Sequence, residues 1–269
     1  MTADTPETDA VAAAAARISH AIASGTPCPP VRDLIGADDI GAAYAVQEKL
    51  TAARLAAGRR LVGRKIGLTA EAVQRQLGVD QPDYGMLFDD MDVANGGVIP
   101  DGRVLQPRCE AEIAFIMGAD LDDARLTTAD IILGTEYVVA AIEVVGSRIA
   151  GWDIRITDTI ADNASSGMFV LGHQPRRIDE VDLIDCGMSL VRAGEPVSVG
   201  AGRACLGSPV NATLWLAKTM ARAGRPLRRG DVVLSGALGP MVGANPGDTF
   251  EARIEGLGAV SVGFGAKES

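Results

Sequence analysis

The stretch LQPRCEAEIAFIMG, Leu105 to Gly118, decides the fold, because it joins the pattern of a buried strand to a pair of glutamates. Residues two apart in a strand point to the same side, so Glu110 and Glu112 share one face while Ala111 and Ile113 share the other. A carboxylate that leaves water costs free energy unless it is paired, protonated or bound to a metal. An E-x-E pair alone is also common on half-exposed strands, so it indicates a site only with further support.

A third glutamate supplies that support. Glu143 lies in VVAAIEVVG (residues 138–146), where apolar residues flank it on both sides and no polar stripe explains it. Three carboxylates that converge from two strands would repel one another, and a hard divalent cation turns that repulsion into binding. Glu110, Glu112 and Glu143 are therefore predicted metal ligands. Because all the ligands are oxygens, Mg²⁺ is the first expectation and Mn²⁺ the second.

The segments around this stretch predict an α+β chain. Two helical patterns near the start predict an N-terminal helical region over residues 1–58, and the glycine-broken β-branched runs that follow predict a β-rich catalytic domain over 59–269. We expect these runs to form an antiparallel core with hairpins. The predicted helices cover 9–24, 39–57, 69–78, 127–138 and 208–224, the last with Ser208 as its N-cap.

Composition excludes several classes of protein. The net charge of −10, from 25 basic and 35 acidic residues without a basic run, argues against a nucleic-acid binder, so an anionic substrate would need a local cation. The four cysteines are far apart and predict neither a zinc ribbon nor a disulfide scaffold, which favours a cytoplasmic location. We expect no signal peptide and no membrane span. His20 and His173 are expected to be structural or exposed to solvent.

Other charged residues lie in glycine-rich or apolar settings. In VGRKIGLT, Arg64 and Lys65 are adjacent, so on a strand they point to opposite sides, and Lys65 is the candidate for the inward position. In VDQPDYG, Asp80 and Asp83 flank a proline and predict a turn. The run RITDTIADNASSG (155–167) predicts a polar loop.

Seven segments together carry a family resemblance: GRKIGLT, LGVDQPDYG, LQPRCEAEIAF, AIEVVGSRI, DTIADNASSG, LGSPVNATLWLA and GDVVLSGALGPMV. In this order they resemble the bacterial 2-keto-4-pentenoate hydratases, also called 2-hydroxypentadienoate hydratases, of the fumarylacetoacetate hydrolase superfamily. The resemblance runs from PPVRDLIG to FEARIEGLGAVSVGF, nearly the whole chain. One departure is Gly151, before Trp152, where an acidic residue is expected in many relatives.

The resemblance implies a mixed β-roll with a small N-terminal helical region, a Mg²⁺ or Mn²⁺ site, and a homo-oligomer that is a pentamer or a decamer. It implies hydration of a short 2-hydroxy-2,4-dienoate from meta-cleavage of aromatic or steroid rings. Lys65 and Asp83 match the catalytic lysine and aspartate of the family. The expected substrate-binding residues are Ser165, which matches a serine near the substrate carboxylate, and Arg64.

Several alternatives stay open at this point. A 4-oxalocrotonate-type decarboxylase of the same superfamily would also chelate a 2-oxo acid on three carboxylates. An acylpyruvase-like hydrolase would need a carboxylate–histidine pair, for which His20 is poorly placed. A non-catalytic partner subunit of the decarboxylase would be expected to lack Lys65 or a carboxylate, and both are present. The length of the dienoate, five or six carbons, and any association with a downstream aldolase are also open.

Overall fold

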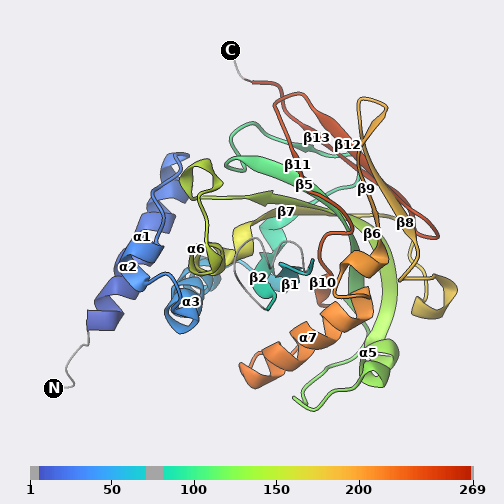
Figure 1. The fold of residues 1–269 in the computed structure, drawn as a ribbon, viewed down its shortest axis with the longest axis horizontal. Coiled ribbons are helices and arrows are strands. Elements are labelled where there is room, and N and C mark those ends of the chain that lie inside the picture. Colours follow the sequence, from blue (N-terminus) through green and yellow to red (C-terminus); the bar gives the residue numbers. More distant parts are fainter. Residues whose placement is uncertain (1–5, 71–80, 268–269) are drawn as a thin grey trace.

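The computed structural model describes residues 6–70 and 81–267 of the 269-residue chain. Two β-sheets form the body of the molecule, and helices lie at its sides (Figure 1). The N-terminal helices stand together on one side, while the two helices labelled α5 and α7 lie near one another on another side. The architecture is α+β with mixed sheets, as the family resemblance implies.

The larger sheet has eight strands among the described residues, in the order β2-β1-β10-β5-β6-β7-β3, with β11 paired to β5. Its strands are β1 (Leu61–Gly67), β2 (Asp83–Phe88), β3 (Asp92–Val93), β5 (Pro107–Met117), β6 (Thr135–Gly146), β7 (Ser166–Leu171), β10 (Val232–Leu234) and β11 (Val242–Gly243). Most neighbours are antiparallel, as expected, but β1 with β10 and β3 with β7 are parallel. The sequence pattern alone favoured antiparallel hairpins. The two parallel pairs join segments far apart in the chain, which hairpins cannot connect, and they give the mixed sheet that the family resemblance implies.

The smaller sheet has the order β4-β13-β12-β8-β9 within the described part of the chain. Its strands are β4 (Val98–Ile99), β8 (Gly187–Arg192), β9 (Glu195–Ala201), β12 (Thr249–Ile254) and β13 (Gly258–Phe264). Two hairpins, β8–β9 and β12–β13, make most of it, and β4 adds a parallel edge. Inward residues such as Leu190 and Phe250 are fully buried and join this sheet to the main apolar core.

Strands β5 and β6 are the centre of the larger sheet. They pair antiparallel without interruption from Pro107 opposite Gly146 to Ile116 opposite Tyr137. Both strands are buried over almost their whole length. This two-sided burial explains their nearly continuous apolar sequence and makes any charged residue on them expensive.

Helices α1, α3 and α7 follow their predicted positions closely, whereas α2 and α6 were not predicted. They are α1 (Pro6–Ser24), α2 (Arg32–Ile35), α3 (Ile40–Ala56), α5 (Thr128–Gly134), α6 (Ile156–Ala161) and α7 (Pro209–Arg222). Asp39 caps α3 by accepting a hydrogen bond from the Ala42 amide, and Ser208 caps α7 in the same way from Val210. The predicted helix over 127–138 ends at Gly134, because the chain turns there into β6. The predicted helix over 69–78 lies almost entirely outside the described residues.

The N-terminal helices share a second apolar core with α6. Ala14 and Ile18 of α1 and Ala43 and Val46 of α3 pack in the same cluster as Ile160 of α6. The division of the chain at residue 58 stays a prediction.

The segment 155–167, expected to be a polar loop, is instead the buried helix α6 followed by the turn η3 (Asn163–Ser165). The expectation was wrong because its polar side chains bond to distant parts of the chain. Asp158 accepts hydrogen bonds from the amides of Val31 and Arg32, and Asp162 pairs with Arg148. The turn expected at Asp80 and Asp83 also differs, since Asp83 is buried as the first residue of β2, while Asp80 lies outside the described residues.

Two smaller expectations, on the cysteines and on the histidines, are confirmed. All four cysteines are free and buried. His20 and His173 are exposed to solvent. No helix in the described ranges is long and apolar enough to cross a membrane.

Candidate metal centre and active site

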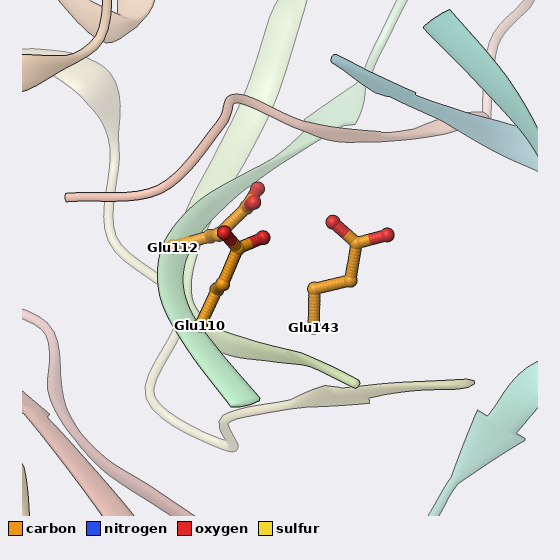
Figure 2. Close-up of side chains that lie close together, drawn as sticks. All are labelled: Glu110, Glu112 and Glu143. Carbon is orange, nitrogen blue, oxygen red and sulfur yellow. The ribbon is translucent and has the colours of Figure 1, made fainter. Parts of the chain in front are cut away.

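The three predicted metal ligands converge. Glu110 and Glu112 project from the same face of β5, and Glu143 on β6 lies directly opposite Glu110 in the ladder (Figure 2). One carboxylate oxygen from each residue lies within 4.8 Å of the others. Glu112 and Glu143 are fully buried, and Glu110 is partly exposed. The three side chains therefore lie together, as the sequence predicted, and their role as metal ligands stays a prediction.

The carboxylates are short of hydrogen-bond donors. Glu112 Oε2 accepts a 2.8 Å hydrogen bond from the Gly236 amide. Its Oε1 and the Oε1 of Glu143 have no hydrogen-bond partner among the described residues, and the Oε2 of Glu143 has only the Lys65 ammonium, at 3.2 Å. Buried oxygens without donors normally cost stability, so their presence here points to a ligand that accepts their lone pairs.

The electrostatics of the group agree with that conclusion. Burial raises the pKa of Glu112 well above its ordinary value, and the neighbouring Glu143 and Glu110 raise it further. Burial also raises the pKa of Glu143, to about 7, although Lys65 opposes the shift. The pKa of Glu110 is raised by burial in the same way, again against Lys65. A bound cation would remove this repulsion, so the all-oxygen donor set fits a hard divalent metal ion.

Lys65 reaches the carboxylates from β1. Its Nζ lies 3.2 Å from Oε2 of Glu143, and the side chain is buried. Burial alone would lower the pKa of Lys65, but the charges of Glu143 and then Asp83 outweigh it, so the pKa is raised. The inward position predicted for Lys65 is thus confirmed.

Asp83 lies beside Lys65 because β1 and β2 pair with Gly67 opposite Asp83. A Cβ on Gly67 would stand 2.1 Å from Asp83 Oδ1 and 3.5 Å from Lys65 Nζ, so both groups occupy the space above this glycine. Burial raises the pKa of Asp83, while Lys65 lowers it. Asp83 Oδ2 accepts a 3.3 Å hydrogen bond from the Thr159 hydroxyl.

Ser165 lies on the turn η3, which packs against β2. The turn is left-handed, with φ between 50° and 56° at Asn163, Ala164 and Ser165. It is held by Asn163, whose side chain exchanges two hydrogen bonds with the backbone of Met86. The buried hydroxyl oxygen of Ser165 has no hydrogen-bond partner among the described residues. Such strain persists only where the surroundings fix it, and it is frequent at functional sites.

The turn also lies close to the strand that pairs with Lys65. A Cβ on Gly85, which stands opposite Lys65 in the ladder, would meet the Asn163 carbonyl at 2.3 Å. The structure thus brings the segment of Ser165 against the strands of Lys65 and Asp83.

The structure does not bring Arg64 to the carboxylates. Its side chain leaves β1 on the opposite face from Lys65, donates to the Gly63 carbonyl at 3.0 Å and lies 3.9 Å from Asp231. It is nevertheless buried, and its assignment to substrate binding stays a prediction.

Sequence reasoning missed three residues of this site. Thr159 was hidden in the expected polar loop, and no pattern in the sequence ties it to Asp83. The Gly236 amide, which donates to Glu112, has a weak signal in the sequence, because a glycine stands two residues after the end of β10. Gly67 had no separate signal, because the need for space above it arises only from strand pairing.

Comparison with known proteins shows to which family the chain belongs. The model of the fumarylacetoacetate (FAA) hydrolase C-terminal family matches residues 66–264. TodF product hydratase from Pseudomonas putida F1 is 61% identical over 97% of this chain and 97% of its own length. 2-Keto-4-pentenoate hydratase 1 from Dechloromonas aromatica is 58% identical, covering 94% of this chain and 96% of its own.

A solved structure agrees in fold. The 4-oxalocrotonate decarboxylase from Pseudomonas putida G7, complexed with magnesium and adipate, superposes with a TM-score of 0.90 at 34% identity, covering 94% of this chain and 97% of that chain. The chain therefore belongs to the fumarylacetoacetate hydrolase family and, within it, to the group of the 2-keto-4-pentenoate hydratases.

Proposed function

We propose that the chain is a metal-dependent hydratase that converts 2-hydroxypenta-2,4-dienoate (2-oxopent-4-enoate) into 4-hydroxy-2-oxopentanoate. The observation that carries the proposal is the group of three carboxylates with the Lys65 ammonium 3.2 Å from Glu143. The 61% and 58% identity to proteins named hydratases supports it. The reaction is that of a hydro-lyase in the meta-cleavage catabolism of aromatic or steroid compounds.

Glu110, Glu112 and Glu143 would hold the cation, Mg²⁺ or Mn²⁺. Their donor set consists of carboxylate oxygens, and some of these oxygens are buried without a donor in the described part of the chain. When bound, such a cation polarises a 2-oxo acid and stabilises negative charge on its oxygens.

Lys65 and Asp83 are the proposed proton-transfer pair. The reaction first moves a proton from the 2-hydroxyl to C5, which gives a 2-oxo-3-enoate; water then adds its OH to C4 and a proton reaches C3. Each step needs one group that gives a proton and one that takes it. The two side chains share the space above Gly67 and are both buried, so they can exchange protons with a substrate out of contact with bulk water.

Ser165 is the proposed substrate-binding residue beside this pair. Its unpartnered buried hydroxyl can donate a hydrogen bond to a carboxylate, and the strained turn fixes its position. We also expect the protein to be cytoplasmic and to form a homo-oligomer, a pentamer or a decamer. Light scattering on the purified protein would test the number of subunits.

The deciding experiment follows the absorbance of the dienoate. The metal-loaded protein should consume it and form 4-hydroxy-2-oxopentanoate, and a chelator should abolish the activity until Mg²⁺ or Mn²⁺ is restored. The Glu112→Gln variant should be inactive, whereas Glu136→Gln, a partly exposed position on β6, should be active. Full activity of the chelated protein would refute the proposal.

A decarboxylase of 4-oxalocrotonate type is the second candidate, favoured by the TM-score of 0.90 with such an enzyme. Incubation with 2-oxo-3-hexenedioate while carbon dioxide is measured separates the two activities. Release of carbon dioxide at a rate comparable to dienoate hydration would favour the decarboxylase. Inactivity on both substrates with normal metal binding would favour a non-catalytic partner subunit.

A further inference from the structure

Helix α3 inserts one buried amide between two segments of the catalytic domain. The Nε2 of Gln47 donates hydrogen bonds to the carbonyls of Tyr84, at 2.9 Å, and Ile160, at 3.0 Å. Both donor hydrogens of the side chain are therefore used, and Gln47 is only 2% exposed. One side chain of the N-terminal region thus ties strand β2 to helix α6.

The two carbonyls that Gln47 binds belong to neighbours of a functional pair. Tyr84 follows Asp83, and Ile160 follows Thr159, whose hydroxyl donates to Asp83 Oδ2 at 3.3 Å. Gln47 therefore fixes the backbone on both sides of the Asp83–Thr159 hydrogen bond. The Thr159 hydroxyl is thus a side-chain donor that fixes one oxygen of Asp83, while Lys65 and the β1–β2 backbone act on the carboxylate from the other side.

The N-terminal region holds α6 at further points. Asp158 accepts from the amides of Val31 and Arg32, and the Thr157 hydroxyl donates to the Ala37 carbonyl at 3.2 Å. All six residues of α6 are buried. The helix that carries Thr159 is thus positioned by residues 31–47, which precede the part of the chain that the family model matches.

Helix α3 also contacts β2 directly. The rings of Tyr44 and Tyr84 stack with their centroids 4.5 Å apart and an interplanar angle of 16°. This contact lies one turn of α3 from Gln47, so the helix meets β2 through both an aromatic stack and a hydrogen bond.

We propose that Gln47 and Thr159 are positioning residues that set the orientation of the Asp83 carboxylate, which makes the N-terminal helical region a part of the active site. The inference rests on the proposed role of Asp83 in proton transfer. A small displacement of a catalytic group lowers kcat more than it weakens substrate binding, because the geometry of the reacting atoms is lost while the binding contacts remain.

The test compares five variants of the metal-loaded enzyme with the dienoate as substrate, and one of them, Asp83→Asn, tests the proposed function itself. Thr159→Val removes the hydroxyl without changing the shape of the side chain, and Thr159→Ser restores it. Gln47→Met removes both donors at similar volume. Thr213→Val is the control, because Thr213 is equally buried and donates to the Pro209 carbonyl at 3.0 Å in α7, away from Asp83.

We expect Thr159→Val and Gln47→Met to lower kcat roughly 10- to 100-fold with KM and Mg²⁺ affinity within about threefold of wild type. Thr159→Ser should recover kcat to within about threefold. Thr213→Val should lower the melting temperature but keep kcat. If Gln47→Met does not fold, the comparison of Thr159→Val with Thr159→Ser decides whether the inference holds.

Two results overturn the inference: wild-type kcat in Thr159→Val, or no recovery in Thr159→Ser. Asp83→Asn separates this failure from failure of the proposed function. If Asp83→Asn is impaired while Thr159→Val and Gln47→Met are not, the positioning role is wrong and the role of Asp83 stands. If Asp83→Asn has wild-type kcat, the proposed role of Asp83 itself is wrong.

Discussion

Glu110 on β5 and Glu143 on β6 stand directly opposite one another in an uninterrupted antiparallel ladder. Like charges in this position destabilise a sheet, and here Glu143 and the neighbouring Glu112 are fully buried while Glu110 is partly exposed. Lys65 compensates one of the three negative charges. The remaining excess is the physical reason to expect a divalent cation between the strands.

Removal of one carboxylate should weaken metal binding and stabilise the metal-free protein. For Glu112→Gln, we expect Mg²⁺ affinity to fall at least about 100-fold by calorimetry, because a charged ligand is lost. The chelated variant should melt at a higher temperature than chelated wild type, since a buried charge is gone and the Gly236 amide keeps an acceptor. Glu136→Gln should change neither quantity. Unchanged Mg²⁺ affinity in Glu112→Gln would remove it from the ligand set.

The stability of the metal-free protein should fall as pH rises from about 4.5 to 7. Burial raises the pKa of Glu143 from an ordinary 4.5 to about 7, so the folded protein binds more protons than the unfolded chain in this window. Stability then decreases with pH, because deprotonation is easier after unfolding. Chelated protein should melt lower at pH 7.5 than at pH 5.5, and saturating Mg²⁺ should reduce the difference. Asp162, with a pKa raised by burial to about 6, adds to the same trend, so Glu143→Gln should flatten the slope without abolishing it.

Loss of the Lys65 amine should stop turnover and spare the metal. For Lys65→Met, we expect kcat to fall about 100-fold or more, the usual contribution of a proton-transfer group. Mg²⁺ should bind at least as tightly as in wild type, because a cation that competes for Glu143 has gone. Lys49→Met, at an exposed position of α3, is the control. Turnover at the wild-type rate in Lys65→Met would contradict the assignment.

A methyl group on Gly67 should displace Asp83. In Gly67→Ala the new Cβ would lie 2.1 Å from Asp83 Oδ1, so the carboxylate must move. We expect kcat to fall at least about tenfold and stability to fall by about 1–3 kcal/mol, as for other overpacked sites. Gly243→Ala has open space around its Cβ and should behave as wild type. Steady-state kinetics and thermal melting test both variants, and an active Gly67→Ala would show that the position of Asp83 is not critical.

The two aspartates that bind Arg32 should differ in their contribution to stability. Asp158 is fully buried and also accepts from the amides of Val31 and Arg32, whereas Asp153 is largely exposed. We expect Asp158→Asn to lower the free energy of unfolding by about 2 kcal/mol, the scale of a charged hydrogen bond. Asp153→Asn should have an effect below about 1 kcal/mol, typical of an exposed ion pair. Chemical denaturation measures both, and equal losses would refute the distinction.

Local sequence patterns predicted much of the fold. The cap of α7 at Ser208 was readable because a cap depends on side chains within three residues of the helix start. Segment 155–167 was misread for the opposite reason. Its aspartates are satisfied by Val31, Arg32 and Arg148, which no local pattern connects to them.

The sequence by itself determined that Glu110 and Glu112 share a face, because strand alternation is a property of the chain, and that Glu143 is anomalous in an apolar strand. The tertiary structure alone decided that Glu143 stands opposite Glu110, since the pairing register of two strands depends on their packing and not on either one. It also decided that Asp83 lies above Gly67 and that Gln47 reaches both β2 and α6. These contacts join residues 16 to 113 positions apart, and such distances are closed only by the folded core.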